Sequence, residues 1–248
     1  MGEVFNKRLI ISGFEVEYYH YKDKPVYRGF DRGPRKKRGE EDIVVEEKVQ
    51  TEKAKSSVDR TRKEIRRRIN SNPKLTKFLT LTFRDEIIDI DIANRKLNLF
   101  TQRARDRWSE FQYLAVPEFQ KSGRVHHHLI CNLRYVRSEE IEKVWGEGFI
   151  KIKLLRKTGN LGLYLCKYLQ KDMFDKRMFR KKKYFCSQSL EKPREMVGKR
   201  VELFLNKNSY NLKLIRETTF NNKFIGEVGY TLFNFTTLGL DLKWNENE

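Results

Sequence analysis

The clearest pattern in the chain is an alternation of apolar and polar residues over short segments, typical of strands with one buried face. In the segment 78–83, Leu79, Leu81 and Phe83 fall on one face, and two threonines lie with Phe78 on the other. The same pattern predicts further strands at about 112–119, 125–132 and 148–155.

Apolar residues at steps of three and four predict helices between these strands. The clearest one spans about 91–108, and shorter helices are predicted at 138–145 and 160–173. A charged helix at about 46–69 is expected to lie on the surface or on a partner. The order predicts an α+β fold, with a central antiparallel sheet of about five strands flanked by helices and with N- and C-terminal elaborations.

Composition shifts suggest three regions along the chain. Residues 1–44 are predicted to hold a β-hairpin and a basic linker rich in glycine. Residues 45–200 are predicted to form the main domain, with its motifs at about 75–180. Residues 201–248 are predicted to be a β-rich extension packed on the same domain.

The charge of the chain points to a polyphosphate partner. Its 248 residues include 53 Lys and Arg against 34 Asp and Glu, a net charge of +19. Such an excess favours nucleic acid, and the 12% of aromatic residues offers rings for stacking unpaired bases. The alternative is a basic surface that serves only solubility.

Other sequence features indicate the cellular compartment and whether the protein binds a membrane or a nucleotide. The three cysteines form no CxxC pair and are expected to be reduced thiols of a cytoplasmic protein. We find neither an apolar leader nor a run of membrane-spanning length, so no membrane association is expected. A phosphate-binding GxxxxGK[ST] loop is also missing, so no nucleotide cofactor is expected and strand separation would need a partner.

Three of the four histidines stand together at 126–128. On a strand, His126 and His128 point to one face and His127 to the core. Glu118 lies on the preceding strand, and a turn at Gly123 would place it near position 127, beside either neighbour. Two imidazoles and a carboxylate can hold a metal ion, and the alternative is a surface strand without an ion. Phosphate chemistry favours Mn²⁺ or Mg²⁺, with zinc less expected.

Two tyrosines follow on the predicted helix at 160–173. Tyr164 and Tyr168 are one turn apart, with Lys167 and Lys171 beside them. A phenol with a pKa near ~10 needs nearby positive charge to act as a nucleophile at neutral pH, and these lysines and the metal would supply it. The alternative is that both tyrosines merely cover the edge of the core.

Together these segments resemble the HUH endonucleases, and more narrowly the rolling-circle replication initiators of phages and plasmids. The strand 78–83, Glu118 with 123–128, and the repeat from Tyr164 to Lys171 match the family's three motifs in order and spacing. His127 departs from the pattern, because that position usually holds a more hydrophobic residue.

The resemblance implies a site-specific nickase and strand transferase. Glu118, His126 and His128 would hold the metal, and a tyrosine would form a 5′-phosphotyrosine link and free a 3′-OH. Two tyrosines would let the second cut the regenerated origin while the first holds the old 5′ end, and if only one tyrosine acts, Tyr164 is favoured. Lys167 would stabilise the phosphate or the phenolate. The implied partners are single-stranded or hairpin origin DNA, a host helicase and a host polymerase, and a homodimer is one arrangement the sequence allows. Residues expected to contact DNA are Lys121, Arg124, Lys171, Arg180 and Lys181.

Two other functions stay open from sequence alone. The same chemistry would serve a plasmid relaxase or a single-strand transposase, which differ in the DNA they cut. A non-catalytic module that binds single-stranded nucleic acid would explain the charge and the aromatic residues without any covalent product.

Overall fold

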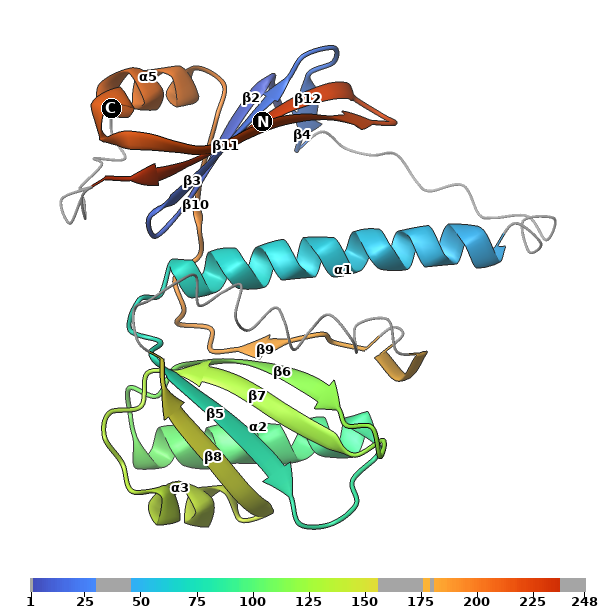
Figure 1. Cartoon of the computed structure of the whole chain (residues 1–248), viewed down its shortest axis with the longest axis vertical. Coiled ribbons are helices and arrows are strands. Elements are labelled where there is room, and N and C mark those ends of the chain that lie inside the picture. Colours follow the sequence, from blue (N-terminus) through green and yellow to red (C-terminus); the bar gives the residue numbers. More distant parts are fainter. Residues whose placement is uncertain (1, 30–45, 156–175, 179–180, 237–248) are drawn as a thin grey trace. The chain divides into compact units, whose positions relative to one another are not determined.

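The computed structural model describes residues 2–29, 46–155, 176–178 and 181–236. The chain forms two compact units. The central unit is Glu40–Glu191, and the terminal unit combines Met1–Gly39 with Lys192–Glu248. Figure 1 shows the helices and strands of both units.

A five-stranded antiparallel sheet forms the middle of the central unit, in the order β8-β5-β7-β6-β9. With the helices of the unit, it confirms the predicted α+β fold. The alternating segments found in the sequence supply four of the strands, whereas β9 is too short for its pattern to be recognised. The bounds are β5 Lys77–Phe83, β6 Tyr113–Phe119, β7 Val125–Cys131, β8 Gly148–Leu154 and β9 Phe185–Cys186.

Helices α2 (Ile90–Arg107) and α3 (Ser138–Trp145) pack against one face of this sheet. The carboxylate of Asp89 begins α2 by accepting a hydrogen bond from the backbone N–H of Asp91 at 2.7 Å, which satisfies a donor that the first turn leaves free. The stripe that predicted α2 is buried, and Trp108 ends the helix as its half-buried C-cap. The stripe residues in the core are Ala93, Leu97, Phe100 and Ala104.

The opposite face of the sheet packs against α1 (Glu46–Asn70). Val58, Ile65 and Ile69 of this charged helix are fully buried in a second core cluster with Phe78 and Ile130 of the sheet. The helix therefore lies at the surface with three apolar side chains anchored to the sheet, which its polar sequence only partly suggested. No helix in the described part of the chain is long and apolar enough to cross a membrane.

The terminal unit joins strands from both ends of the chain in one antiparallel sheet, in the order β10-β2-β3-β12-β11. Beside it lies a two-stranded ribbon of β1 and β4. Strand β12 pairs with β3, and β10 pairs with β2. The bounds are β1 Glu3–Phe5, β2 Lys7–Ser12, β3 Glu15–Tyr21, β4 Val26–Arg28, β10 Arg194–Val197, β11 Leu212–Asn222 and β12 Gly226–Phe235.

This pairing differs from the division expected at residues 44 and 200. The predicted N-terminal hairpin is present as β2 and β3, but its sheet includes the C-terminal strands, because distant strand pairing leaves no local signal. The C-terminal region also contains a helix, α5 (Lys199–Asn208), in addition to its strands. Val201 and Phe204 of α5 are buried against the sheet.

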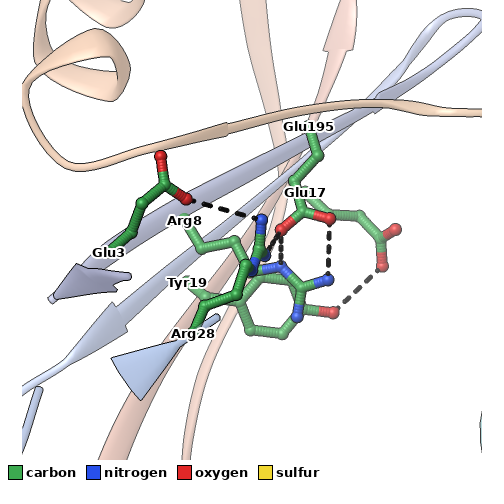
Figure 2. Close-up of polar contacts among 6 residues, drawn as sticks. All are labelled: Glu3, Arg8, Glu17, Tyr19, Arg28 and Glu195. Atoms are coloured by element: carbon green, nitrogen blue, oxygen red, sulfur yellow. Dashed lines mark hydrogen bonds and ion pairs between the residues drawn. The ribbon is translucent and has the colours of Figure 1, made fainter. Parts of the chain in front are cut away.

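A cluster of charged side chains connects β2, β4 and β10, as Figure 2 shows. The guanidinium of Arg8 makes two contacts with Glu195, Nε to Oε1 at 2.8 Å and Nη2 to Oε2 at 3.1 Å. Arg28 also contacts Glu195 and lies 4.0 Å from Glu3. Burial opposes ionisation of Glu195, but the two arginines outweigh that effect and lower its pKa.

Candidate metal centre

Strand β7 separates the three histidines between the two faces of the sheet. His127 is fully buried on the α2 face, where its Nε2 lies 3.2 Å from Oδ1 of Asn94 and its ring meets the edge of Phe83. Burial lowers the pKa of His127 to about 3, and the neighbouring histidines add to this effect. His127 is therefore an uncharged core residue, as the alternation predicted, which explains why it can occupy a position usual for an apolar side chain.

The β6–β7 hairpin positions Glu118 against the other two histidines. Its loop contains three residues, 121–123, and closes with a hydrogen bond from the backbone N–H of Gln120 to the carbonyl of Arg124 at 2.8 Å. Gly123 has φ +87°, a left-handed conformation that this type of turn requires and glycine adopts without strain. The resulting register places Glu118 directly opposite His126, one residue from the position estimated from sequence.

The ring of His128 is fixed at both nitrogens. Its Nε2 contacts Oε2 of Glu118, and its Nδ1 lies 3.1 Å from the hydroxyl of Thr80 on β5. Phe78 stacks on the same ring, with a centroid distance of 5.4 Å and an angle of 17°. A carboxylate only accepts hydrogen bonds, so Nε2 carries a proton in its contact with Glu118. If Nε2 gives its lone pair to a metal ion instead, the proton lies on Nδ1, which faces the hydroxyl of Thr80.

Sequence reasoning did not assign a role to Thr80. Its place on the same face as Phe78 was visible in the alternation, but the pairing of Thr80 with His128 depends on the register between β5 and β7. That register is set by strands almost 50 residues apart in sequence, so no local pattern could indicate the contact.

His126 is half-buried and lies next to Gln120, whose Nε2 is 3.5 Å from Nδ1 of the imidazole. Burial lowers the pKa of His126, His128 and Arg124 add to this effect, and Glu118 opposes it. The neutral imidazole that results is the form able to donate a lone pair to a metal ion.

A carboxylate and two imidazoles are suitable ligands for a divalent metal ion. In this structure, however, the side chains of Glu118, His126 and His128 do not point to a common centre. In the described residues, no three His, Cys, Asp or Glu side chains converge as a metal site. Glu118 and His128 touch each other, and His126 is turned to Gln120. The backbone register nevertheless presents all three from one face of the sheet.

The other residues expected at the site fall into two groups. Arg124 forms an ion pair with Glu86, and Lys181 forms one with Asp91. Lys121 is exposed in the β6–β7 turn. Outside the described residues lie Tyr164, Lys167, Tyr168, Lys171 and Arg180.

The chain is anchored on either side of the segment that carries the tyrosines. Before it, the N–H of Leu155 donates to the carbonyl of Thr76 at 2.8 Å, beside the start of β5. After it, the guanidinium of Arg177 lies 3.6 Å from the ring centre of Phe119 and donates to the carbonyl of Gly123 at 3.2 Å. The second anchor is therefore at the hairpin that carries Glu118.

The antiparallel sheet thus presents two histidines and a carboxylate on one face. A scan of family models matches residues 76–173 to the family described as "Replication-associated protein ORF2/G2P". The matched residues include the whole candidate metal centre, and the match supports a replication initiator role. No curated protein and no solved structure matches the chain.

Proposed function

We propose that this protein is an HUH-type replication initiator that nicks single-stranded origin DNA and later rejoins the strands. The main support is one juxtaposition: Glu118, His126 and His128 share a face of the sheet, inside the segment that matches a replication-associated family. The net charge of +19 suits a nucleic-acid substrate, and it would favour binding of many sequences at low salt.

Glu118, His126 and His128 would hold Mn²⁺ or Mg²⁺ in this proposal. The ion, when bound, would act as a Lewis acid on an oxygen of the scissile phosphate. With an ion bound at Nε2 of His128, the hydroxyl of Thr80 would accept a hydrogen bond from Nδ1, and Phe78 stacks on the same ring. These contacts reduce the side-chain freedom that ligand binding would otherwise remove.

Tyr164 is proposed as the first nucleophile and Tyr168 as the second. The phenolate oxygen would attack the phosphorus, the bond from phosphorus to the 3′-oxygen would break, and that oxygen would take up a proton. The product is a 5′-phosphotyrosine with a free 3′-OH for a host polymerase, working with a host helicase. Attack of a 3′-OH on the phosphotyrosine would reverse the chemistry and join strands, with Lys167 stabilising the phosphate or the phenolate.

The test is formation of a covalent protein–DNA adduct. The protein is incubated with circular single-stranded DNA pools and Mn²⁺, then separated on a denaturing gel, and the adduct is mapped by mass spectrometry. We expect an adduct that EDTA prevents and that maps to Tyr164 or Tyr168. Tyr164→Phe with Tyr168→Phe should abolish it, while Tyr210→Phe, a change at an exposed tyrosine of the terminal unit, should not.

Replacement of single histidines tests the metal assignment in the same assay. His126→Ala and His128→Ala should each abolish the adduct and keep most salt-sensitive binding. His20→Ala in the terminal unit is the matched control and should keep the adduct. Adducts in both site variants would contradict the metal centre, and tight binding without any adduct would favour a non-catalytic binding module. Cleavage at a transfer origin or a mobile-element end would indicate a relaxase or a transposase.

A further inference from the structure

Strand β8 forms one edge of the central sheet and carries exposed side chains on the face of the candidate metal centre. Its pairing with β5 places Phe149 opposite Thr82, Lys151 opposite Thr80 and Lys153 opposite Phe78. Residues directly opposite in antiparallel strands point to the same face. Phe149, Lys151 and Lys153 therefore share a face with His126 and His128.

Phe149 stands in the same row across the sheet as two of the proposed ligands. The row runs from Phe149 through Thr82 and His126 to Glu118. Since neighbouring strands are about 4.8 Å apart, Phe149 lies on the order of 10 Å from His126. That spacing is comparable to one or two nucleotides of an extended single strand.

Within the described part of the central unit, no packing requirement accounts for the exposure of these side chains. Phe149 is 58% exposed, while Ile150 and Ile152 on the other face of β8 pack against the core. Lys151 and Lys153 are exposed, and within the described residues neither forms an ion pair. A single exposed phenylalanine is common on protein surfaces. Here the ring lies on the same strand edge as two lysines, and single-stranded nucleic acid is bound by aromatic rings that stack on bases and by positive charges that contact phosphates.

We propose that Phe149, Lys151 and Lys153 form a binding platform for the single strand next to the cleaved phosphate. One base would stack on the ring of Phe149, and the lysines would contact backbone phosphates along β8. This inference rests on the proposed function for the position of the cut, and its binding step needs neither metal nor tyrosine chemistry. The platform would determine which nucleotides next to the cleaved phosphate are bound by the protein.

Two matched controls lie on or near the same strand. Leu154 is 61% exposed on β8 but opposes Lys77, so it points to the other face. Lys143 is an exposed lysine of α3, which packs on the sheet face opposite to the candidate metal centre. Leu154→Ala and Lys143→Ala thus remove comparable exposed groups away from the platform.

The experiment measures binding of a fluorescein-labelled mixed-sequence 20-mer in EDTA, by anisotropy over a range of salt concentrations. Phe149→Ala should weaken binding about tenfold, Phe149→Trp should preserve it, and Leu154→Ala should have little effect. Lys151→Ala with Lys153→Ala should lower the slope of log K against log salt by about 1.4, because each lost phosphate contact contributes about 0.7. Lys143→Ala should leave the slope unchanged.

A second readout detects the stacked base directly. The same 20-mer with 5-iodouracil is irradiated in the complex, and crosslinked peptides are identified by mass spectrometry. A crosslink at Phe149 supports the platform, even if the protein forms no adduct with any DNA. Equal affinities for Phe149→Ala and Leu154→Ala, or crosslinks at other residues alone, would overturn it, even if the nicking assay succeeds.

Discussion

The hydroxyl of Thr80 lies 3.1 Å from Nδ1 of His128, on the opposite side of the ring from Glu118. This contact makes Thr80 a positioning residue for the proposed metal centre. Thr80→Val keeps the shape of the side chain but removes the hydrogen bond, so we expect the Mn²⁺ concentration for half-maximal adduct formation to rise 10- to 100-fold. Thr80→Ser should restore it, and equal Mn²⁺ dependence in the valine variant would show that Thr80 does not act through His128.

His127 should be dispensable for chemistry although it stands between the two proposed ligands. Because it is neutral and buried, His127→Leu should retain adduct formation and change the free energy of unfolding by only about 1 kcal/mol, whereas His128→Leu should abolish the adduct. Urea denaturation and the adduct assay measure both effects. A folded His127→Leu protein that forms no adduct would assign His127 to the site.

The contact of Arg8 with Glu195 should make stability depend on pH in the acidic range. The pKa of Glu195 is lowered in the folded state from its ordinary value of 4.5, so the unfolded state binds a proton first as the pH falls. Ionised Glu195 thus stabilises the fold above about pH 4.5, and that contribution is lost as the pH falls through the lower, folded-state pKa.

Glu195→Gln tests this dependence. We expect the variant to be less stable than the wild type at pH 7, by roughly 1 kcal/mol for such a partly exposed ion pair. Its stability should decline less than that of the wild type below pH 4.5. Thermal unfolding monitored by circular dichroism from pH 7 to pH 3 measures both, and parallel curves would contradict the assignment.

Helix α1 should depend on its few apolar side chains for its attachment to the sheet. Ile65 is fully buried against the sheet, so Ile65→Ala should destabilise the protein by about 2–4 kcal/mol in urea denaturation. Arg60 is exposed on the same helix, and Arg60→Ala should change the stability by less than about 0.5 kcal/mol. Similar stabilities of the two variants would mean that α1 docks weakly.

The sequence predicted best those features that depend on local periodicity. The strands at 78–83 and 148–155 and the helix that ends near Trp108 were visible because apolar side chains recur at the period of each element. The same alternation separated His127 from its neighbours.

Features that depend on long-range pairing could not be predicted in this way. The pairing of β12 with β3, the contact of Thr80 with His128 and the row from Phe149 to Glu118 each join segments far apart in the chain. Helix α5 was missed because its ten residues show only a short apolar stripe between strand-forming segments.

The pairing of β3 with β12 also has a consequence for synthesis on the ribosome. The edge of β3 that β12 covers stays without this partner until residues 226–235 have been translated, because the whole central unit is encoded between them. At about 5–20 residues per second, roughly 10–40 s pass before the partner strand emerges. During that time the central unit can complete its own sheet, so the order of translation separates the folding of the two units in time.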